Sequence, residues 1–203
     1  SLKLNGKGEI FIVSPSGFTS LIRKVDEKGI MRKVMGTVDK DYLESIAKSK
    51  YKGKVQTGEL AIITTFSDIA FDPKGNMFIS DRLNHQIRKI SAQGEITTIA
   101  GTGESAYYGD GGPASEAAFR DPGALTTDKE GNLYIADGAN NMIRKIDTKG
   151  IVSTVGGNGN HENSGDGGPA LKAGIRNMDY LAMSPTGELH IAGMNSHVVR
   201  KIT

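Results

Sequence analysis

The chain has 203 residues, is 37% hydrophobic, lacks cysteine and carries a formal net charge of +2. A chain of this length can bury a core without disulfides or metals, and the absence of cysteine excludes disulfides, thiolate metal ligands and cysteine nucleophiles. The small net charge argues against nucleic-acid binding. The absence of a run of about 18 apolar residues argues against membrane insertion.

A repeat of 56 residues dominates the sequence from residue 75 onward. The segment Ile-Arg-Lys-Ile at 87–90 recurs at 143–146 and, as Val-Arg-Lys-Ile, at 199–202. The segment Gly-Asp-Gly-Gly-Pro-Ala at 109–114 recurs at 165–170. A period of this size, rich in glycine and β-branched residues, indicates an array of equivalent supersecondary units.

Each unit is predicted to contain four short strands. Apolar runs alternate with turns that begin with Asp, Asn or Ser and end with Gly, as at 128–131, and such turns close β-hairpins. The units are 1–36, 66–101, 122–157 and 178–203, the last without its fourth strand, and 37–65 is an insertion or long connection.

Four-stranded units of this length favour an all-β fold, a β-propeller in which each unit is one blade. About four blades are present. The alternative is a parallel β-helix, but the coils of a β-helix are usually shorter and lack tight hairpins.

The stretch at 131–144, Gly-Asn-Leu-Tyr-Ile-Ala-Asp-Gly-Ala-Asn-Asn-Met-Ile-Arg, closely resembles the NHL repeat, most strongly within residues 66–157. The resemblance implies a larger propeller, usually six-bladed, whose remaining blades or neighbouring domain lie elsewhere in the same protein. It also implies recognition of macromolecules. Bacterial members are often periplasmic, secreted or on the cell surface, sometimes after an immunoglobulin-like IPT/TIG domain.

The arginine that recurs in the third strand of each blade is expected to be structural. Asp81 precedes Arg88 by seven residues, and Asp137 precedes Arg144 by the same spacing. We therefore predict an ion pair within each blade, in preference to a functional basic ring. The last blade keeps Arg200 but has glycine in place of the aspartate.

The connections between blades share one face of a propeller with the second turns, and we expect a ligand site there. Arg120 and Arg176 align across the repeat near the channel mouth and can bind a carboxylate or phosphate, or pair with Asp121. Tyr107 and Tyr108 can stack on a sugar or peptide, or pack on a neighbouring loop.

Asp110, His161 and Asp166 complete the candidate ligand-binding rim. The two aspartates lie in glycine-rich loops that lack the acidic spacing of a calcium site and the lysine of a phosphate-binding loop. The preferred interpretation is a bend that leads into a short helix, at 114–119 and again at 170–175.

The insertion at 37–65 contains a stretch compatible with a helix at 42–50. Its lysines are either a solvated face or a surface for an acidic partner, with the solvated face preferred. The lysines are Lys40, Lys48, Lys50, Lys52 and Lys54.

Two functions are consistent with these observations. The first is a non-enzymatic binding or scaffolding propeller that recognises a glycan, peptide or protein through its loop-rich face and needs no cofactor. The second is a propeller hydrolase or lyase with a divalent metal at the central channel, which the family resemblance allows. Because no nucleophile motif and no tight pair of metal ligands is apparent, the first is preferred.

Overall fold

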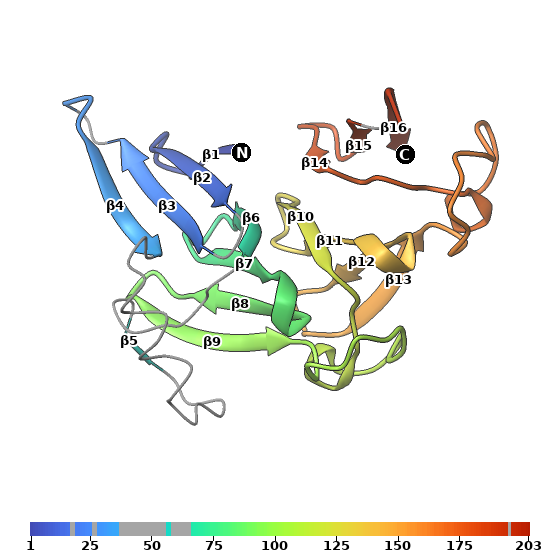
Figure 1. Cartoon of the computed structure of the whole chain (residues 1–203), viewed down its shortest axis with the longest axis horizontal. Coiled ribbons are helices and arrows are strands. Elements are labelled where there is room, and N and C mark those ends of the chain that lie inside the picture. Colours follow the sequence, from blue (N-terminus) through green and yellow to red (C-terminus); the bar gives the residue numbers. More distant parts are fainter. Residues whose placement is uncertain (17–18, 26–27, 37–55, 58–65, 195) are drawn as a thin grey trace.

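The computed structural model describes residues 1–16, 19–25, 28–36, 56–57, 66–194 and 196–203. Its strands form four antiparallel sheets that follow one another around an arc (Figure 1). The first strands of neighbouring sheets pack together, with β6 (Phe66–Phe71) against β10 (Pro122–Thr127) and β10 against β14 (Tyr180–Met183). The predicted β-propeller is confirmed.

The blades follow the chain order. The first contains β1 (Leu2–Leu4), β2 (Ile10–Ser16), β3 (Thr19–Val25) and β4 (Met31–Gly36). The second contains β6, β7 (Met77–Asp81), β8 (Gln86–Ile90) and β9 (Glu95–Ala100). The third contains β10, β11 (Leu133–Asp137), β12 (Met142–Ile146) and β13 (Val152–Gly156). The fourth contains β14, β15 (Leu189–Gly193) and β16 (Val198–Ile202).

The hairpin turns are stabilised by an aspartate side chain, which accepts a hydrogen bond from a backbone N–H within the turn. In the third blade, Asp128 Oδ1 accepts a hydrogen bond from the backbone N–H of Asn132 at 2.8 Å. Gly131 takes a φ of +92°, which a residue with a side chain rarely adopts. The same arrangement recurs at Asp72 and Gly75, so the turn pattern read from the sequence is also the pattern in the structure.

The core lies between the blades as three apolar clusters. Ile69 and Ile79 are fully buried between the first and second blades, and Leu125 and Ile135 between the second and third. The third cluster, around Ile143, packs the third blade against the fourth. Each sheet therefore buries side chains on the face that meets its neighbour, as the alternation along a strand requires.

The helices predicted at 114–119 and 170–175 are shorter in the structure. Only the 3₁₀ turns η2 (Ala114–Glu116) and η4 (Ala170–Lys172) form. The chain then becomes extended, because Ala117 accepts a hydrogen bond from Thr102 N–H (2.9 Å) and the Ala118 N–H donates to Tyr108 O (3.3 Å). Two similar 3₁₀ turns, η1 (Arg82–Asn84) and η3 (Gly138–Asn140), form the second turns of their blades.

The second sheet gains a strand that the sequence pattern does not predict. β5 (Gln56–Thr57) pairs with the outer edge of β9. The helix expected at 42–50 and the lysines of that segment lie outside the described residues. Within the described part of the chain, no helix is long and apolar enough to cross a membrane.

Candidate functional site

Arg144 on β12 is fully buried and holds the preceding connection against its own blade. All five of its N–H groups donate: two to Asp110 Oδ1 (3.1 and 2.8 Å), one to Asp137 Oδ2 (3.4 Å), and one each to the backbone oxygens of Ala118 and Tyr108 (both 3.2 Å). Such complete pairing is what a buried guanidinium requires. The residue is structural.

Arg200 on β16 repeats this arrangement one blade later. Its Nε donates to Asp166 Oδ1 at 2.7 Å, and its Nη groups donate to the backbone oxygens of Gly174 and Ser164 at 2.6 and 2.8 Å. These partners are the 56-residue equivalents of three of the four residues that hold Arg144; the fourth, Asp137, is replaced by Gly193. Asp110 and Asp166, both proposed from the sequence as ligand residues, are thus placed beside these arginines.

The second blade has the ion pair that the seven-residue spacing predicts. Arg88 Nε lies 3.0 Å from Asp81 Oδ2, and Arg88 also donates to the hydroxyl of Thr98 on β9. Burial raises the pKa of the Asp81 carboxyl, against the opposing charge of Arg88. In the third blade burial raises the pKa of Asp137 to about 6, although Asn140, the Arg120 N–H and Arg144 all act to lower it.

The pKa of Asp110 shifts in the opposite direction to that of Asp137. Partial burial acts to raise its pKa, but the hydrogen bond from Thr154 and the charge of Arg144 outweigh that effect, so the pKa is lowered. The carboxylate therefore stays ionised and holds the connection to the guanidinium.

The two tyrosines belong to different environments. The ring of Tyr107 lies over the Arg144 guanidinium, 4.8 Å from centroid to carbon, and its hydroxyl contacts Thr154 at 2.9 Å. The Tyr108 hydroxyl donates to Glu104 at 2.8 Å. Both rings remain about two-fifths exposed. Tyr107 thus packs against the third blade, whereas Tyr108 bonds within its own connection.

Arg120 is exposed, and its 56-residue equivalent Arg176 is half-buried. Their backbone N–H groups donate to Asp137 Oδ1 (2.7 Å) and Asn163 Oδ1 (3.2 Å). Neither guanidinium has a hydrogen-bond or ion-pair partner among the described residues. The carboxylate of Asp121, considered as a partner of Arg120, instead lies 3.5 Å from Arg82.

A cavity of about 470 Å³ opens at the inner ends of three blades. Its base includes small residues, Gly123, Ala124, Gly138 and Ala139. Polar side chains surround these small residues. Of the ligand-binding residues predicted from the sequence, only His161 lines the cavity. The polar members are Ser67, Asp68, Arg82, Asp121, Asn141, His161, Asn177 and Asp179.

The repeat places equivalent residues around this cavity. Asp121 and Asn177 lie 56 residues apart, and both have left-handed backbone, with φ of +53° and +52°. The Asp121 N–H donates to His85 Nδ1 at 3.2 Å. His161 Nδ1 lies 3.4 Å from Asn141 Oδ1. The polar groups are thus held in fixed positions by backbone geometry and by their neighbours.

Several of these groups retain unused hydrogen-bonding capacity. One oxygen of Asp179 accepts from the Met194 N–H at 2.6 Å, and the other has no hydrogen-bond partner in the described part of the chain. The amide of Asn177 likewise makes no side-chain hydrogen bond with the described residues. Exposed acceptors and donors next to a small-residue floor can bind a polar molecule.

Comparisons with known proteins agree with this architecture. Residues 102–165 match the family model described as the teneurin NHL domain. The repeat is an NHL repeat. Teneurin-1 of Gallus gallus is 36% identical to this NHL propeller over 106 residues, and Teneurin-m of Drosophila melanogaster 32% over 149 residues. These matches cover 45% and 64% of the chain but only 4% and 5% of those much longer relatives.

Solved structures share the fold of the NHL propeller at low sequence identity. An auxiliary nutrient binding protein from Bacteroides thetaiotaomicron has a TM-score of 0.61 at 18% identity, with 98% of this chain aligned to 46% of that one. A catalytically inactive virginiamycin B lyase from Staphylococcus aureus, solved with quinupristin, has a TM-score of 0.54 at 15% identity, with 100% of this chain aligned to 51% of that one. The chain spans about half of each structure.

Proposed function

We propose that this NHL propeller is a non-enzymatic binding module that recognises a neutral polar ligand, a glycan in the first instance, at the cavity on its loop-rich face. The observation that carries the proposal is the lining itself, in which acidic, amide, imidazole and guanidinium groups surround a base of small residues. Such groups match the alternating donors and acceptors of sugar hydroxyls.

The charge balance of the cavity favours a neutral ligand over an anion. Its one guanidinium, on Arg82, lies 3.5 Å from the carboxylate of Asp121 and is partly neutralised. Asp179 adds a further negative charge. A phosphate or carboxylate would have to approach these acidic groups, which is unfavourable.

Arg120 and Arg176 extend the site at its rim. They precede Asp121 and Asn177 directly in the sequence, so the repeat places both next to the cavity lining. With no partner among the described residues, their guanidinium groups are available to an acidic or hydroxylated part of a larger ligand.

The fold alone is compatible with binding and with catalysis, since the structural neighbours include a nutrient binding protein and a lyase. The donor set supports binding. Within the described residues, no group of three or more His, Asp or Glu side chains is arranged to hold a metal ion. The metal-assisted hydrolase or lyase therefore has less support from the geometry.

A glycan array followed by calorimetry tests the proposal. For the strongest array hit, Asn177→Ala and Asp179→Ala should each weaken binding about tenfold, because each removes one or two hydrogen bonds to the ligand. Lys129→Ala, on an exposed hairpin turn of the third blade, is the matched control and should bind normally. Unchanged affinity in both cavity variants would refute the site.

The enzymatic alternative has a separate readout. Thermal unfolding in the presence of divalent metals should show no chelator-sensitive shift if the protein is a cofactor-free binding module. A large metal-dependent rise in Tm would favour the hydrolase or lyase instead.

A further inference from the structure

A groove of about 380 Å³ lies between the second and third blades, at their hairpin turns. The first turn of the second blade, around Lys74, lines one side, and two turns of the third blade, around Glu130 and Thr148, line the other. No described residue lines both this groove and the cavity proposed to bind a glycan. A groove of this volume can hold a small molecule, so it is a candidate for a second binding site.

The base of the groove is apolar and belongs to the core between the two blades. Phe78 on β7, Leu133 on β11 and Ile146 on β12 are buried in one cluster. Ile99 on β9 packs against this cluster and is half-buried. All four line the groove, and both blades contribute, so packing between the blades fixes the shape of the base. Such a surface can bury an apolar part of a ligand.

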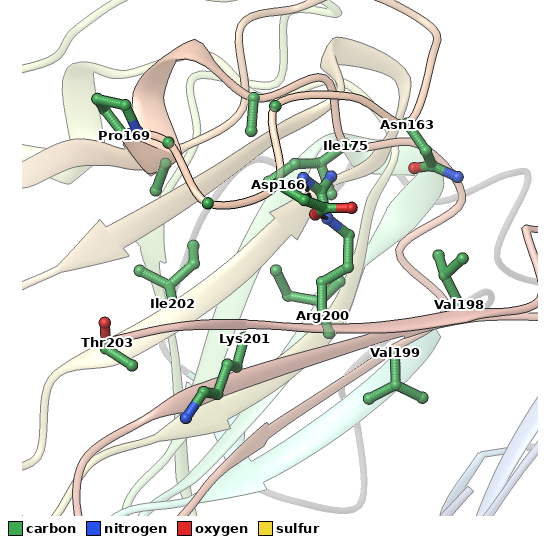
Figure 2. A pocket seen from close by; sticks show the side chains of 16 residues that line it. Asn163, Asp166, Pro169, Ile175, Val198, Val199, Arg200, Lys201, Ile202 and Thr203 are labelled. Carbon is green, nitrogen blue, oxygen red and sulfur yellow. Dashed lines mark hydrogen bonds and ion pairs between the residues drawn. The ribbon is translucent and has the colours of Figure 1, made fainter.

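A lysine recurs on the third strand of every blade, directly after the recurring arginine. Figure 2 shows this pair in the fourth blade, where Arg200 points toward the loop that carries Asp166 and Lys201 points to the other side of β16. Successive side chains of a strand alternate between its two sides, so the lysine faces away from the arginine. In the second blade, the equivalent Lys89 lines the groove.

Three of the four lysines have a partner within their own blade. The partner is a glutamate in the first and fourth blades, and in the third blade it is a tyrosine ring whose centroid lies 5.5 Å from the ammonium nitrogen. The pairs are Lys24–Glu9, Lys201–Glu188 and Lys145–Tyr134. In these three blades the protein itself therefore compensates the positive charge.

Lys89 differs from the other three lysines. Asn76 occupies the position of the glutamates, and its side-chain amide donates to Asp72 Oδ2 at 2.6 Å. Phe78 occupies the position of Tyr134 opposite the lysine. Lys89 is half-buried, yet its ammonium makes no hydrogen bond, ion pair or ring contact with the described residues. A partly buried charge without a counter-charge is unfavourable, so an anion should be attracted to this position.

Three carboxylates also line the groove, but each is already engaged. Asp72 and Asp147 accept hydrogen bonds from backbone N–H groups of their own turns. Glu130 lies 3.8 Å from the neighbouring Lys129. The side chain of Lys74 has no partner in the part of the chain that the structure describes, and it adds a second unpaired ammonium to the groove.

We propose that this groove binds a small organic monocarboxylate. The carboxylate pairs with the ammonium of Lys89, and Lys74 at the rim adds a second positive charge. An aromatic or short aliphatic group of the ligand covers the apolar base. A single negative charge fits best, because the engaged carboxylates of Asp72, Glu130 and Asp147 would repel a dianion more strongly. The site is independent of the proposed glycan recognition.

Phenylacetate and its neutral amide, phenylacetamide, are a matched pair of probes for this site. Each is titrated against the whole protein and followed by ¹⁵N chemical shifts. Phenylacetate should bind saturably and about tenfold more tightly than the amide, because only the carboxylate forms a charge-assisted bond with Lys89. The shifts should concentrate at the N–H groups of Lys74, Lys89 and Thr148. Equal affinity of the two probes, no binding, or shifts centred on Asn177 in the glycan cavity would each overturn the proposal.

Lys89→Met removes the charge while keeping the length of the side chain. It should weaken phenylacetate binding about tenfold without lowering Tm, since no bond to a described residue is lost. Lys145→Met is the matched control, because Lys145 is the repeat equivalent of Lys89 and contacts Tyr134. The control should bind phenylacetate normally. Unchanged affinity in Lys89→Met, or an equal loss in both variants, would contradict the proposed role of Lys89 and overturn the proposal.

A double variant, Asp72→Asn with Asn76→Glu, tests the same point without removing the lysine. It gives the second blade the residues of the first, where Asn5 donates to Glu9 at 2.6 Å and Glu9 pairs with the lysine. The net charge does not change, but Lys89 gains an internal partner. Binding of phenylacetate should fall about tenfold while Tm is maintained or rises. Full affinity in this variant would show that the unpaired charge does not select the ligand, and the proposal would be wrong.

Discussion

Among single side chains, the clearest contrast is between Arg144 and its repeat equivalent Arg200. Arg144 has no exposed side-chain surface and bonds to two carboxylates, whereas Arg200 is 13% exposed and bonds to the exposed Asp166. Arg144→Ala leaves Asp137 buried without its counter-charge and should lower the free energy of unfolding by about 3–5 kcal/mol. Arg200→Ala should lower it by about 2 kcal/mol or less.

Urea unfolding of the two variants measures this difference. Equal losses in both would show that burial of the guanidinium does not decide its role. Retention of full stability in Arg144→Ala would contradict the structural assignment of the recurring arginine.

Asp137 makes stability depend on pH in a predictable direction. Its pKa is about 6 in the folded protein and 3.8 ordinarily, so the native state binds its proton more tightly between these values. The stabilisation from this group is fully present below pH 3.8 and is lost as the pH rises through about 6. The slope is on the order of 1 kcal/mol per pH unit.

Asp137→Asn removes this titration while keeping the shape of the side chain. The difference in unfolding free energy between the native protein and the variant should therefore shrink as the pH rises from 4 to 6. Denaturant titrations at four pH values provide the measurement. A difference that is constant with pH would show that the carboxyl is not perturbed.

Among the elements, the connections between blades contain glycines of two kinds. Some have a positive φ and a close backbone neighbour, and others have a positive φ in open space. Gly157 has a φ of +93°, and a Cβ there would lie 2.3 Å from the backbone oxygen of Asn141. Gly167 has a φ of +80° but open space around it. Gly157→Ala combines steric overlap with backbone strain and should destabilise by more than about 3 kcal/mol, whereas Gly167→Ala should cost about 1 kcal/mol.

Thermal unfolding of the two glycine variants checks this expectation. If Gly167→Ala proves as damaging as Gly157→Ala, then backbone strain rather than the close approach of Asn141 determines the requirement for glycine at these loops.

Local patterns in the sequence predict the blades well because hairpin turns are encoded within a few residues. The Asp–Arg pairs are likewise visible, since a seven-residue spacing spans two adjacent strands. The bond from Arg144 to Asp110 is not predicted, because those residues lie 34 positions apart and meet only through the path of the connection. The sequence does not predict the cavity either, because its lining residues are far apart along the chain. The one available signal was that Asp121 and Asn177 are 56 residues apart.

In the whole molecule, Asp68 connects three blades at the centre. It lies on β6, and its Oδ2 is 2.7 Å from Lys3 Nζ on β1 and accepts from the Leu125 N–H on β10 at 3.0 Å. Asp68→Ala leaves the buried Leu125 N–H unpaired and removes the counter-charge of Lys3, which keeps its hydrogen bond to Leu125 O, and should destabilise by about 2–4 kcal/mol. Hydrogen exchange at the Leu125 N–H should accelerate at the same time.

Asp147→Ala is the matched control, because Asp147 stabilises a hairpin turn within one blade. In Asp147→Ala, the exchange rate of the Leu125 N–H should change only by the amount that the variant's loss of global stability accounts for. If Asp68→Ala affects only β1 and not Leu125, the three blades are not coupled through this carboxylate.

The proposed function places ligand recognition at the cavity formed by three blades. The most direct measurement is ¹⁵N chemical-shift mapping of the protein with the strongest glycan-array hit. We expect the shifts to concentrate at Asp121, Asn141, His161 and Asn177. Shifts confined to the hairpin turns around Asp128 on the opposite face, with none at the cavity, would contradict it.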